Sequence, residues 1–253
     1  MEHKTTPQQY TQRYDAVVTA VRKVNKEMKF VGLALADPGS NPEMFFYFLN
    51  HDNHRPGIPL DMISYHFYAT PTETQTLDSW QYTFFEQADH FFTTLRYVEA
   101  IRKRLSPETQ TTLDEIGSYL PTDYLPDLES APSNVDTKGL IPPGYWNLSG
   151  ALYAYVYLEA AKLGIDVVGE SWLLGFPSQF PSASMVDWNT GTPNARLRVL
   201  ELLHRSFSHG DRMVNTTIAG TEVVAQAFSS SAGKKLLLIR PTTIRPRNSL
   251  KFA

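Results

Sequence analysis

Six residues with chemically useful side chains stand at the ends of four apolar segments of the sequence. They are two glutamates, an aspartate, a histidine, a tyrosine and a tryptophan: Asp37, His66, Tyr68, Glu115, Glu170 and Trp172. Glycoside hydrolysis uses paired carboxyl groups, and aromatic rings with few cations are typical of sites that hold sugars. These residue types therefore point to carbohydrate chemistry.

Each of these residues also has a structural explanation. An acid at a strand end, such as Glu115, can cap the following turn or pair with an arginine. His66 and Tyr68 lie two positions apart and share one face of a strand. A hydrogen-bonded core pair explains them as well as an active site does. Glu170 can likewise be a buried structural carboxylate.

The motifs of several other enzyme classes do not occur in the sequence. It contains no HExxH, no phosphate-binding loop, no GxGxxG after a strand and no GxSxG nucleophile motif. It contains no cysteine, which excludes disulfides, thiol catalysis and cysteine-ligated metals. His51, Asp52 and His54 are candidate metal ligands, but their spacing matches no compact metal motif. We expect neither a metal nor a cofactor.

The four apolar segments are predicted strands. They cover residues 30–36, 62–68, 111–116 and 166–172. Helical patterns alternate with them, over residues 7–28, 42–49, 79–104, 146–163 and 194–207. This alternation predicts an α/β fold whose parallel strands are adjacent in chain order. Because chemistry collects at the carboxyl ends of such strands, we expect Glu115, Tyr68 and Glu170 to lie within a few hydrogen-bond lengths of one another.

The pattern changes after residue 209. A long loop with several prolines is expected at 118–145, still within the first part of the chain. Beyond residue 210, the apolar segments 223–228 and 236–239 flank a turn-like stretch and predict antiparallel strands. We therefore expect two domains, residues 1–209 and residues 210–253.

Composition narrows the class of partner. The chain has 253 residues, 42% of them hydrophobic and 19% charged, with a net charge of −3. No basic stripe suggests nucleic acid. No apolar run approaches the roughly 18 residues of a membrane span, and the N-terminus lacks the apolar stretch of a signal peptide. We expect a carbohydrate substrate as the partner, without nucleic acid or membrane.

Three stretches of the sequence resemble glycoside hydrolase family 39. The longest covers residues 169–196, with Gly-Glu-Ser-Trp at its start and Val-Asp-Trp-Asn-Thr-Gly near its end. It resembles the last barrel strand and helix of that family. The opening stretch, residues 6–16, resembles the helix after the fourth strand, and residues 64–68 resemble the sixth strand.

The resemblance implies the C-terminal half, about strands 5–8, of a (β/α)8 TIM barrel, followed by the start of a β-sandwich accessory domain. In this clan of retaining glycosidases one glutamate is the acid/base and a second, on strand 7, is the nucleophile. Glu115 matches the nucleophile, and Tyr68 with His66 matches the group that orients it. The resemblance assigns substrate contacts to Glu170 and Trp172. Asp37, at the end of the first predicted strand, is expected to bind substrate at the same edge.

The sequence departs from the family at the acid/base, which lies in an Asn-Glu pair. No Asn-Glu occurs here, and Glu2, followed by His3, matches the linker after that pair. We therefore expect a truncated glycoside hydrolase. One alternative is a catalytically inactive, carbohydrate-binding remnant of such an enzyme. Another is an independent four-stranded doubly wound domain that binds a small ligand, against which the missing phosphate loop argues.

Overall fold

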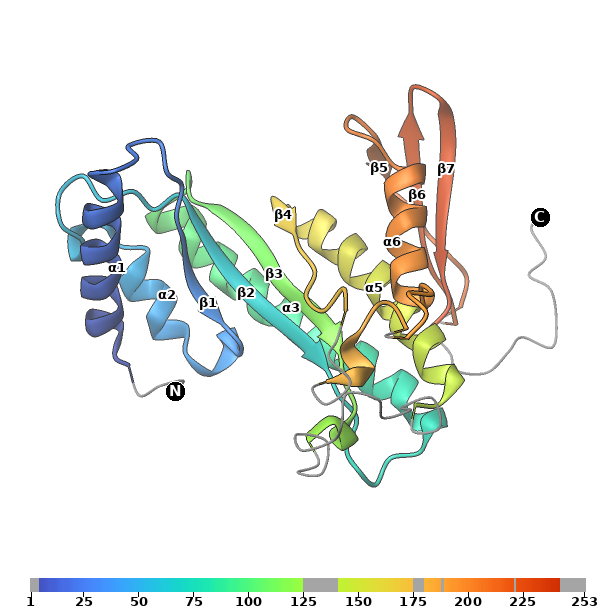
Figure 1. Cartoon of the computed structure of the whole chain (residues 1–253). Helices are drawn as coiled ribbons and strands as arrows, with labels where there is room; N and C mark the ends of the chain where they lie inside the picture. The colour runs from blue at the N-terminus through green and yellow to red at the C-terminus, as the bar shows by residue number, and fades with distance from the viewer. Residues whose placement is uncertain (1–4, 125–140, 175–179, 188, 221, 242–253) are drawn as a thin grey trace. The chain divides into compact units, whose positions relative to one another are not determined.

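The computed structural model describes residues 5–124, 141–174, 180–187, 189–220 and 222–241 (Figure 1). The chain forms two compact units that interleave along the sequence. The first comprises Met1–Tyr68, Ala88–Ile116 and Glu159–Ser171, and the second comprises Ala69–Gln87, Gly117–Leu158 and Trp172–Ala253. The domains expected at 1–209 and 210–253 stay predictions.

Parts of three sequence-based expectations lie outside the described residues. They are Glu2, most of the predicted loop at 118–145, and positions 175–179 and 188 of the family-like stretch.

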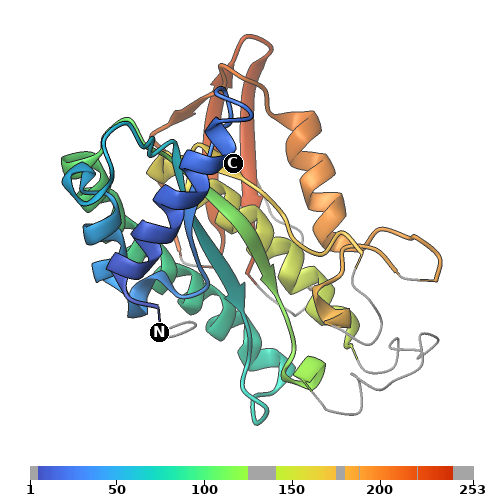
Figure 2. The same ribbon diagram turned by 60° about the vertical axis from the view of Figure 1, so that its left-hand side comes forward.

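A parallel four-stranded sheet forms the centre of the first unit (Figures 1 and 2). Its strands are β1 (Val31–Leu35), β2 (Met62–Ala69), β3 (Gln110–Ser118) and β4 (Val167–Val168). They are neighbours in chain order, with Val31 opposite Met62 and Thr112 opposite Val167. The prediction of adjacent parallel strands in this order is confirmed.

The fourth strand is much shorter than the predicted 166–172. The Gly169 amide still donates to the carbonyl of Leu113 at 2.6 Å, but the chain then leaves the ladder. Trp172 has a backbone φ of 66°, in the left-handed region, which no extended strand accommodates. The prediction of a strand over residues 166–172, made from the apolar residues of this segment, was therefore too long.

Helix α1 (Pro7–Arg22) begins as predicted and ends earlier. Thr6 Oγ1 accepts from the Gln9 amide at 3.2 Å, and Gln9 Oε1 accepts from the Thr6 amide at 3.1 Å, which forms a capping box. The pattern predicted helix to residue 28, but Val24 is 91% exposed. An apolar face that packs against nothing does not prolong a helix.

The other predicted helices form within a few residues of their expected ends. They are α2 (Pro42–Phe48), α3 (Leu77–Leu105), α5 (Pro143–Leu163) and α6 (Ala195–Ser206). Short 3-10 helices supplement them at η2 (Pro38–Ser40), η3 (His51–Asn53), η4 (Pro121–Tyr124) and η6 (Pro181–Ala183).

Helices α1 and α2 pack on β1 through aromatic rings. The Tyr14 and Phe48 rings meet edge to face, with centroids 4.8 Å apart. A Cβ at Gly32 would lie 2.6 Å from Phe48 Cζ, so only glycine lets the ring approach the strand this closely. The next residue, Leu33, has a φ of 54°, and its amide donates to the Tyr10 hydroxyl at 2.8 Å.

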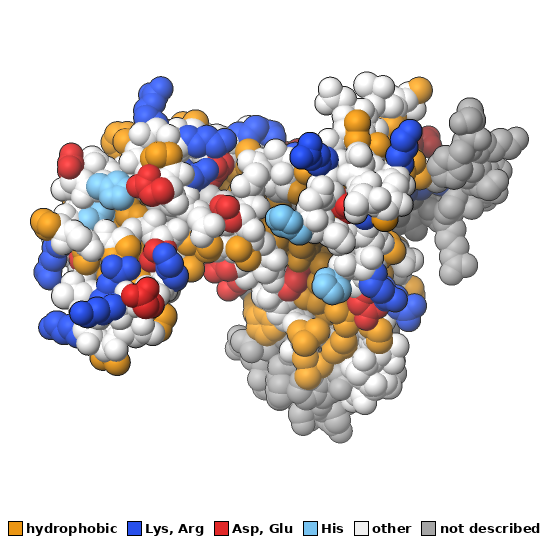
Figure 3. Space-filling view, turned by 90° about the horizontal axis from the view of Figure 1, so that it is seen from above, with side chains coloured by type: hydrophobic (Ala, Val, Ile, Leu, Met, Phe, Trp, Pro, Cys, Tyr) orange, Lys and Arg blue, Asp and Glu red, His pale blue; other side chains and the backbone are white. Residues whose placement is uncertain are grey.

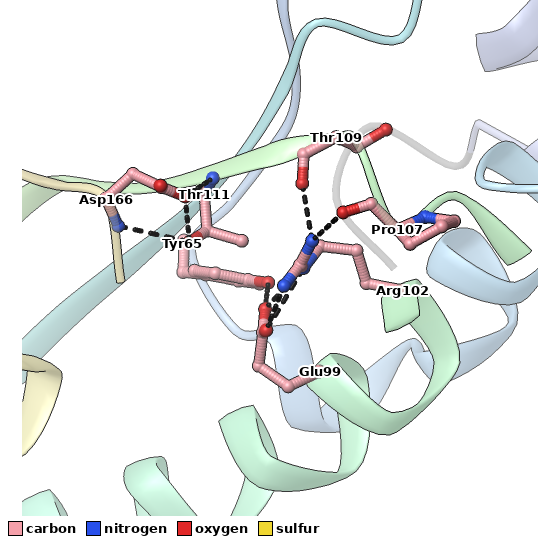
Figure 4. Close-up of polar contacts among 7 residues, drawn as sticks. All are labelled: Tyr65, Glu99, Arg102, Pro107, Thr109, Thr111 and Asp166. Carbon is pink, nitrogen blue, oxygen red and sulfur yellow. Dashed lines mark hydrogen bonds and ion pairs between the residues drawn. The ribbon is translucent and has the colours of Figure 1, made fainter. Parts of the chain in front are cut away.

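A buried ion pair holds α3 against the start of β3 (Figure 4). Arg102 Nη2 lies 2.8 Å from Glu99 Oε2, and Arg102 Nη1 donates to the carbonyl of Thr109 at 2.7 Å. Glu99 also accepts from the Tyr65 hydroxyl at 3.2 Å. Burial, reinforced by the Glu99 charge, raises the pKa of Tyr65 well above its usual value, so Tyr65 stays neutral.

The start of β4 is joined to β3 at the same edge. Asp166 Oδ2 accepts from the Thr111 amide at 2.8 Å and from the Thr111 hydroxyl at 3.1 Å (Figure 4). The polar residues at the amino ends of these strands therefore satisfy one another's hydrogen-bonding groups.

The second unit contains a three-stranded antiparallel sheet. Its order is β5 (Arg212–Val214), β6 (Val224–Ser230) and β7 (Gly233–Ile239). The predicted antiparallel pair is confirmed by the β6–β7 hairpin, in which Ser230 pairs with Gly233. The sheet packs on α5, where Ala154 and Leu158 contact Ile239. Strand β5 was not predicted, because three exposed residues carry no periodic signal.

A fully buried arginine, Arg196, forms hydrogen bonds with several segments of the second unit. Arg196 donates to Ser149 Oγ at 2.9 Å, to the Ser184 carbonyl at 3.2 Å and to the Tyr145 hydroxyl at 2.6 Å. It also donates to the carbonyl and hydroxyl oxygens of Ser118. Its guanidinium lies 5.1–5.6 Å from the centroids of three aromatic rings. Serine and carbonyl oxygens thus replace water around this charge.

One face of the molecule carries side chains of different kinds. On the face seen in Figure 3, basic side chains lie among acidic and apolar ones. Within the described residues, no helix combines the length and apolar character that crossing a bilayer requires.

We expect Gly32→Ala to lower the free energy of unfolding by about 1–3 kcal/mol, the usual cost of overpacking. The new methyl group would displace the Phe48 ring. Urea unfolding followed by circular dichroism measures the change. Gly39→Ala is the matched control, because a Cβ there meets its nearest atoms at 3.4 Å. Equal effects of the two substitutions would contradict the packing argument.

We expect Glu99→Gln to lower the free energy of unfolding by about 3–5 kcal/mol, because it leaves the buried Arg102 charge uncompensated. Glu159→Gln is the control, since Glu159 pairs with Lys162 at the same i,i+3 spacing, with the Lys162 side chain 38% exposed. Exposed pairs contribute about 0–1 kcal/mol. Urea midpoints that do not separate the two variants would show that the buried pair is not needed for stability.

Candidate functional site

The candidate site begins at the carboxyl end of β2. Phe67 is buried and stacks on Phe91 of α3, with centroids 4.8 Å apart. Because side chains alternate along a strand, His66 and Tyr68 share the opposite face. Both are only partly buried, and the His66 side chain is 15% exposed. The core contact of Phe67 therefore fixes the direction of its two polar neighbours.

Strand β3 brings two carboxylates to these residues. Glu115 Oε2 accepts from the Tyr68 hydroxyl at 3.0 Å and lies 3.5 Å from His66 Nδ1. His66 Nε2 lies 3.4 Å from Asp114 Oδ1, so the imidazole stands between two acids. The structure thus brings together Glu115, Tyr68 and His66 of the predicted set. It adds Asp114, the residue that precedes Glu115 in the sequence.

The Glu115 side chain is partly exposed and is contacted at one of its two oxygens. Its side chain is 42% exposed. Tyr68 and His66 both contact Oε2, and no donor among the described residues contacts Oε1. Within the described part of the chain, His66 is the only basic side chain at ion-pair distance from Glu115. The arrangement holds one oxygen in place and presents the other.

The segment after β4 reaches the same residues. Ser171 Oγ forms a hydrogen bond with the Tyr68 hydroxyl across 103 positions of sequence. Glu170 directly precedes Ser171 and is partly buried. Sequence reasoning missed Ser171, because serine has no distinctive spacing. Its place between the two flagged residues Glu170 and Trp172 was the available signal.

Trp172 has an unusual backbone in the second unit. Its φ of 66° costs a residue with a side chain about 1–2 kcal/mol. Its ring is tilted against that of Phe180, with centroids 5.4 Å apart, and Phe180 in turn lies 6.1 Å from the Tyr119 ring. Strained residues of this kind concentrate at functional sites, and the substrate contact of Trp172 stays a prediction.

Asp37 uses its carboxylate within its own turn. Oδ1 accepts from the amides of Gly39 and Ser40 at 3.1 and 3.3 Å, and Oδ2 accepts from the Ser40 hydroxyl. This is a cap for η2 at the carboxyl end of β1. No hydrogen bond or ion pair joins Asp37 to Glu115 among the described residues, and its role in substrate binding stays a prediction.

His51 and His54, the candidate metal ligands in the sequence, contact different partners. His54 lies between Asp15 Oδ1, at 2.7 Å, and the Phe48 carbonyl, at 2.6 Å. His51 Nε2 lies 2.7 Å from Ser106 Oγ. Over the described ranges, no three His, Asp or Glu side chains are grouped as metal ligands.

Two solved structures share the fold of most of this chain. An arabinofuranosidase of family GH51 from Xanthomonas axonopodis pv. citri matches 91% of this chain with 48% of its own, at TM-score 0.59 and 10% identity. A second arabinofuranosidase matches 92% with 47% of its own, at TM-score 0.54 and 13% identity. The chain therefore spans about half the length of these proteins. At such identities the likeness shows the fold alone.

No protein-family model and no curated protein matches the sequence. The resemblance to family 39 therefore stays a prediction, while similarity to part of a glycosidase fold is a structural finding.

We expect Asp37→Ala to lower the free energy of unfolding by about 1 kcal/mol, the usual cost of losing a cap. Asp37→Asn keeps an acceptor oxygen, so its free energy of unfolding should stay within about 0.5 kcal/mol of that of the parent protein. Thermal unfolding of the three proteins measures both effects. If the alanine variant is as stable as the parent, Asp37 is not needed as a cap, and that result would favour a role in substrate binding.

Proposed function

We propose that this chain carries the nucleophile of a retaining glycoside hydrolase, and that the nucleophile is Glu115. The observation that carries the proposal is the contact of Glu115 Oε2 with the Tyr68 hydroxyl and His66 at the carboxyl end of β3. Similarity to a glycosidase fold and the family 39-like stretches of the sequence support it.

The mechanism that fits this arrangement has two steps. Oε1 of Glu115 attacks the anomeric carbon, the bond to the leaving oxygen breaks, and a glycosyl ester forms on Glu115. Water then attacks the same carbon, the ester bond breaks, the attacking water gives up one proton to the solvent, and Glu115 returns as a carboxylate. Tyr68 keeps the reactive carboxylate oriented by its bond to Oε2.

A general acid normally protonates the leaving oxygen in the first step and contributes a factor of about 10²–10⁴. The family places this acid in an Asn-Glu pair, which does not occur in this sequence. In this proposal the sheet corresponds to about strands 5–8 of a TIM barrel, and β5–β7 to the start of a β-sandwich. Natural glycosides, which need protonation, should then react poorly with this chain alone.

Substrate contacts complete the proposal. Glu170 lies at the edge that holds Glu115, since its neighbour Ser171 contacts Tyr68. We assign Glu170 to sugar binding, and Trp172 keeps the stacking role that the family resemblance implies. Asp37, at the carboxyl end of β1, keeps the substrate-binding role that we expect of it. Arabinofuranosides are the first substrates to test, because the two solved structures described above are of arabinofuranosidases.

A catalytically inactive, carbohydrate-binding remnant is the second candidate. The absence of an Asn-Glu pair favours it. The two candidates differ in covalent chemistry, because a remnant binds sugar without forming an ester on Glu115.

We expect activated glycosides to label Glu115 covalently. Dinitrophenyl 2-deoxy-2-fluoroglycosides suit this test, because dinitrophenolate departs without a proton and the fluorine slows hydrolysis of the ester. A panel of arabinofuranosyl, xylosyl and glucosyl compounds should add one glycosyl group to the chain. Intact-mass and peptide mass spectrometry locate the adduct.

Glu115→Gln should abolish labelling, since the amide keeps the shape but lacks the nucleophilic charge. Glu27→Gln, in an exposed position on the first unit, is the control and should label as the parent does. An adduct that persists in the Glu115 variant would overturn the assignment. Sugar binding without an adduct in the parent would favour the remnant.

A further inference from the structure

We infer that Ser171 is a positioning residue for Glu115 and acts through Tyr68. In this arrangement the Ser171 hydroxyl donates to the Tyr68 oxygen and directs the Tyr68 proton to Glu115. The inference rests on the proposed function for its catalytic consequence. The hydrogen bond itself can be tested without any activity.

The direction of the hydrogen bonds follows from counting protons. A tyrosine hydroxyl carries one proton, and an ionised carboxylate can only accept. The Tyr68 proton goes to Glu115 Oε2, at 3.0 Å. Ser171 Oγ contacts the same Tyr68 oxygen, so Ser171 must be the donor in that contact. The chain of donation runs from Ser171 to Tyr68 to Glu115.

This chain crosses three parts of the first unit. Tyr68 belongs to β2, Glu115 to β3, and Ser171 to the segment that follows β4. The amide of Gly169 donates to the Leu113 carbonyl at 2.6 Å, which ties that segment to β3 just before the reactive residues. This bond therefore helps to place Ser171 within hydrogen-bonding distance of the Tyr68 hydroxyl.

The chemical effect follows from cooperativity. A hydroxyl that accepts a hydrogen bond becomes a better donor, so Ser171 strengthens the bond from Tyr68 to Glu115. That bond orients the carboxylate for its attack in the first step and stabilises the carboxylate charge that is released in the second. It also keeps Oε2 engaged, which leaves Oε1 to react.

The test compares Ser171→Ala with Ser64→Ala as a matched control. Ser171 is partly buried, whereas Ser64 is fully buried in the first unit, on β2, and its hydroxyl has no hydrogen-bond partner among the described residues. We expect Ser171→Ala to lower the initial rate of Glu115 labelling about tenfold, the effect of one lost hydrogen bond. The glycoside concentration at half-maximal rate should stay unchanged, and Ser64→Ala should label at the parent rate.

Conservative variants separate positioning from simple packing. Ser171→Thr keeps the hydroxyl and should recover most of the rate. Ser171→Cys keeps the volume with a weaker donor and should fall between serine and alanine. If the alanine variant does not fold, the threonine and cysteine variants still give this order. A threonine variant as slow as the cysteine variant would overturn the inference.

A second readout does not depend on activity. In protein labelled with carbon-13 at the tyrosine ζ position, the Tyr68 signal is assigned by its loss in Tyr68→Phe. The Tyr68 signal should move in Ser171→Ala and stay in place in Ser64→Ala. An unmoved signal, or an unchanged labelling rate, overturns the inference. A moved signal in a protein whose parent form is never labelled overturns the proposed function of Glu115 and leaves the hydrogen bond established.

Discussion

The buried pair of Glu99 and Arg102 fixes the amino-terminal edge of the first unit's sheet, and the carboxyl-terminal edge depends on it. Arg102 binds the carbonyl of Thr109, just before β3, while Glu99 binds Tyr65 on β2. The Thr109 hydroxyl donates to the Leu60 carbonyl at 2.8 Å, which sets the start of β3 beside the start of β2. Buried charges of this kind are costly unless they are fully paired. The pairing therefore holds the two strands in the alignment that the structure shows.

That alignment produces two sheet edges with opposite character. At the amino-terminal edge, buried polar groups bind one another and are closed to solvent. At the carboxyl-terminal edge, Glu115 and Asp114 stay partly exposed, with His66 between them. A carboxylate that is oriented but still open to solvent is suited to meet a ligand, whereas Glu99, at 3% side-chain exposure, is suited to stability. The two glutamates thus differ in their surroundings, because Glu99 on α3 is enclosed and Glu115 on β3 is open to solvent.

Sequence reasoning predicted the features that depend on local pattern. The order of the strands, the start of α1 at residue 7 and the grouping of Tyr68 with Glu115 all follow from apolar periodicity and strand ends. The end of α1 and the length of β4 could not be predicted in this way. The first depends on whether Val24 packs against another part of the protein, and the second depends on the left-handed backbone of Trp172. Ser171 could not be predicted for a related reason, since its partner Tyr68 is 103 positions away in the sequence. The roles of Glu115, Glu170 and Asp37 in binding or catalysis stay predictions.

The surroundings of Arg196 have a consequence for how the second unit folds. The guanidinium carries a charge, and its acceptors at Ser118, Tyr145, Ser149 and Ser184 lie as far as 78 positions from Arg196 in the sequence. It cannot lose its water shell until all of these segments have assembled. We therefore place its burial after the main barrier to folding. Weakening this cluster would shorten the lifetime of the folded unit while leaving its rate of formation nearly unchanged.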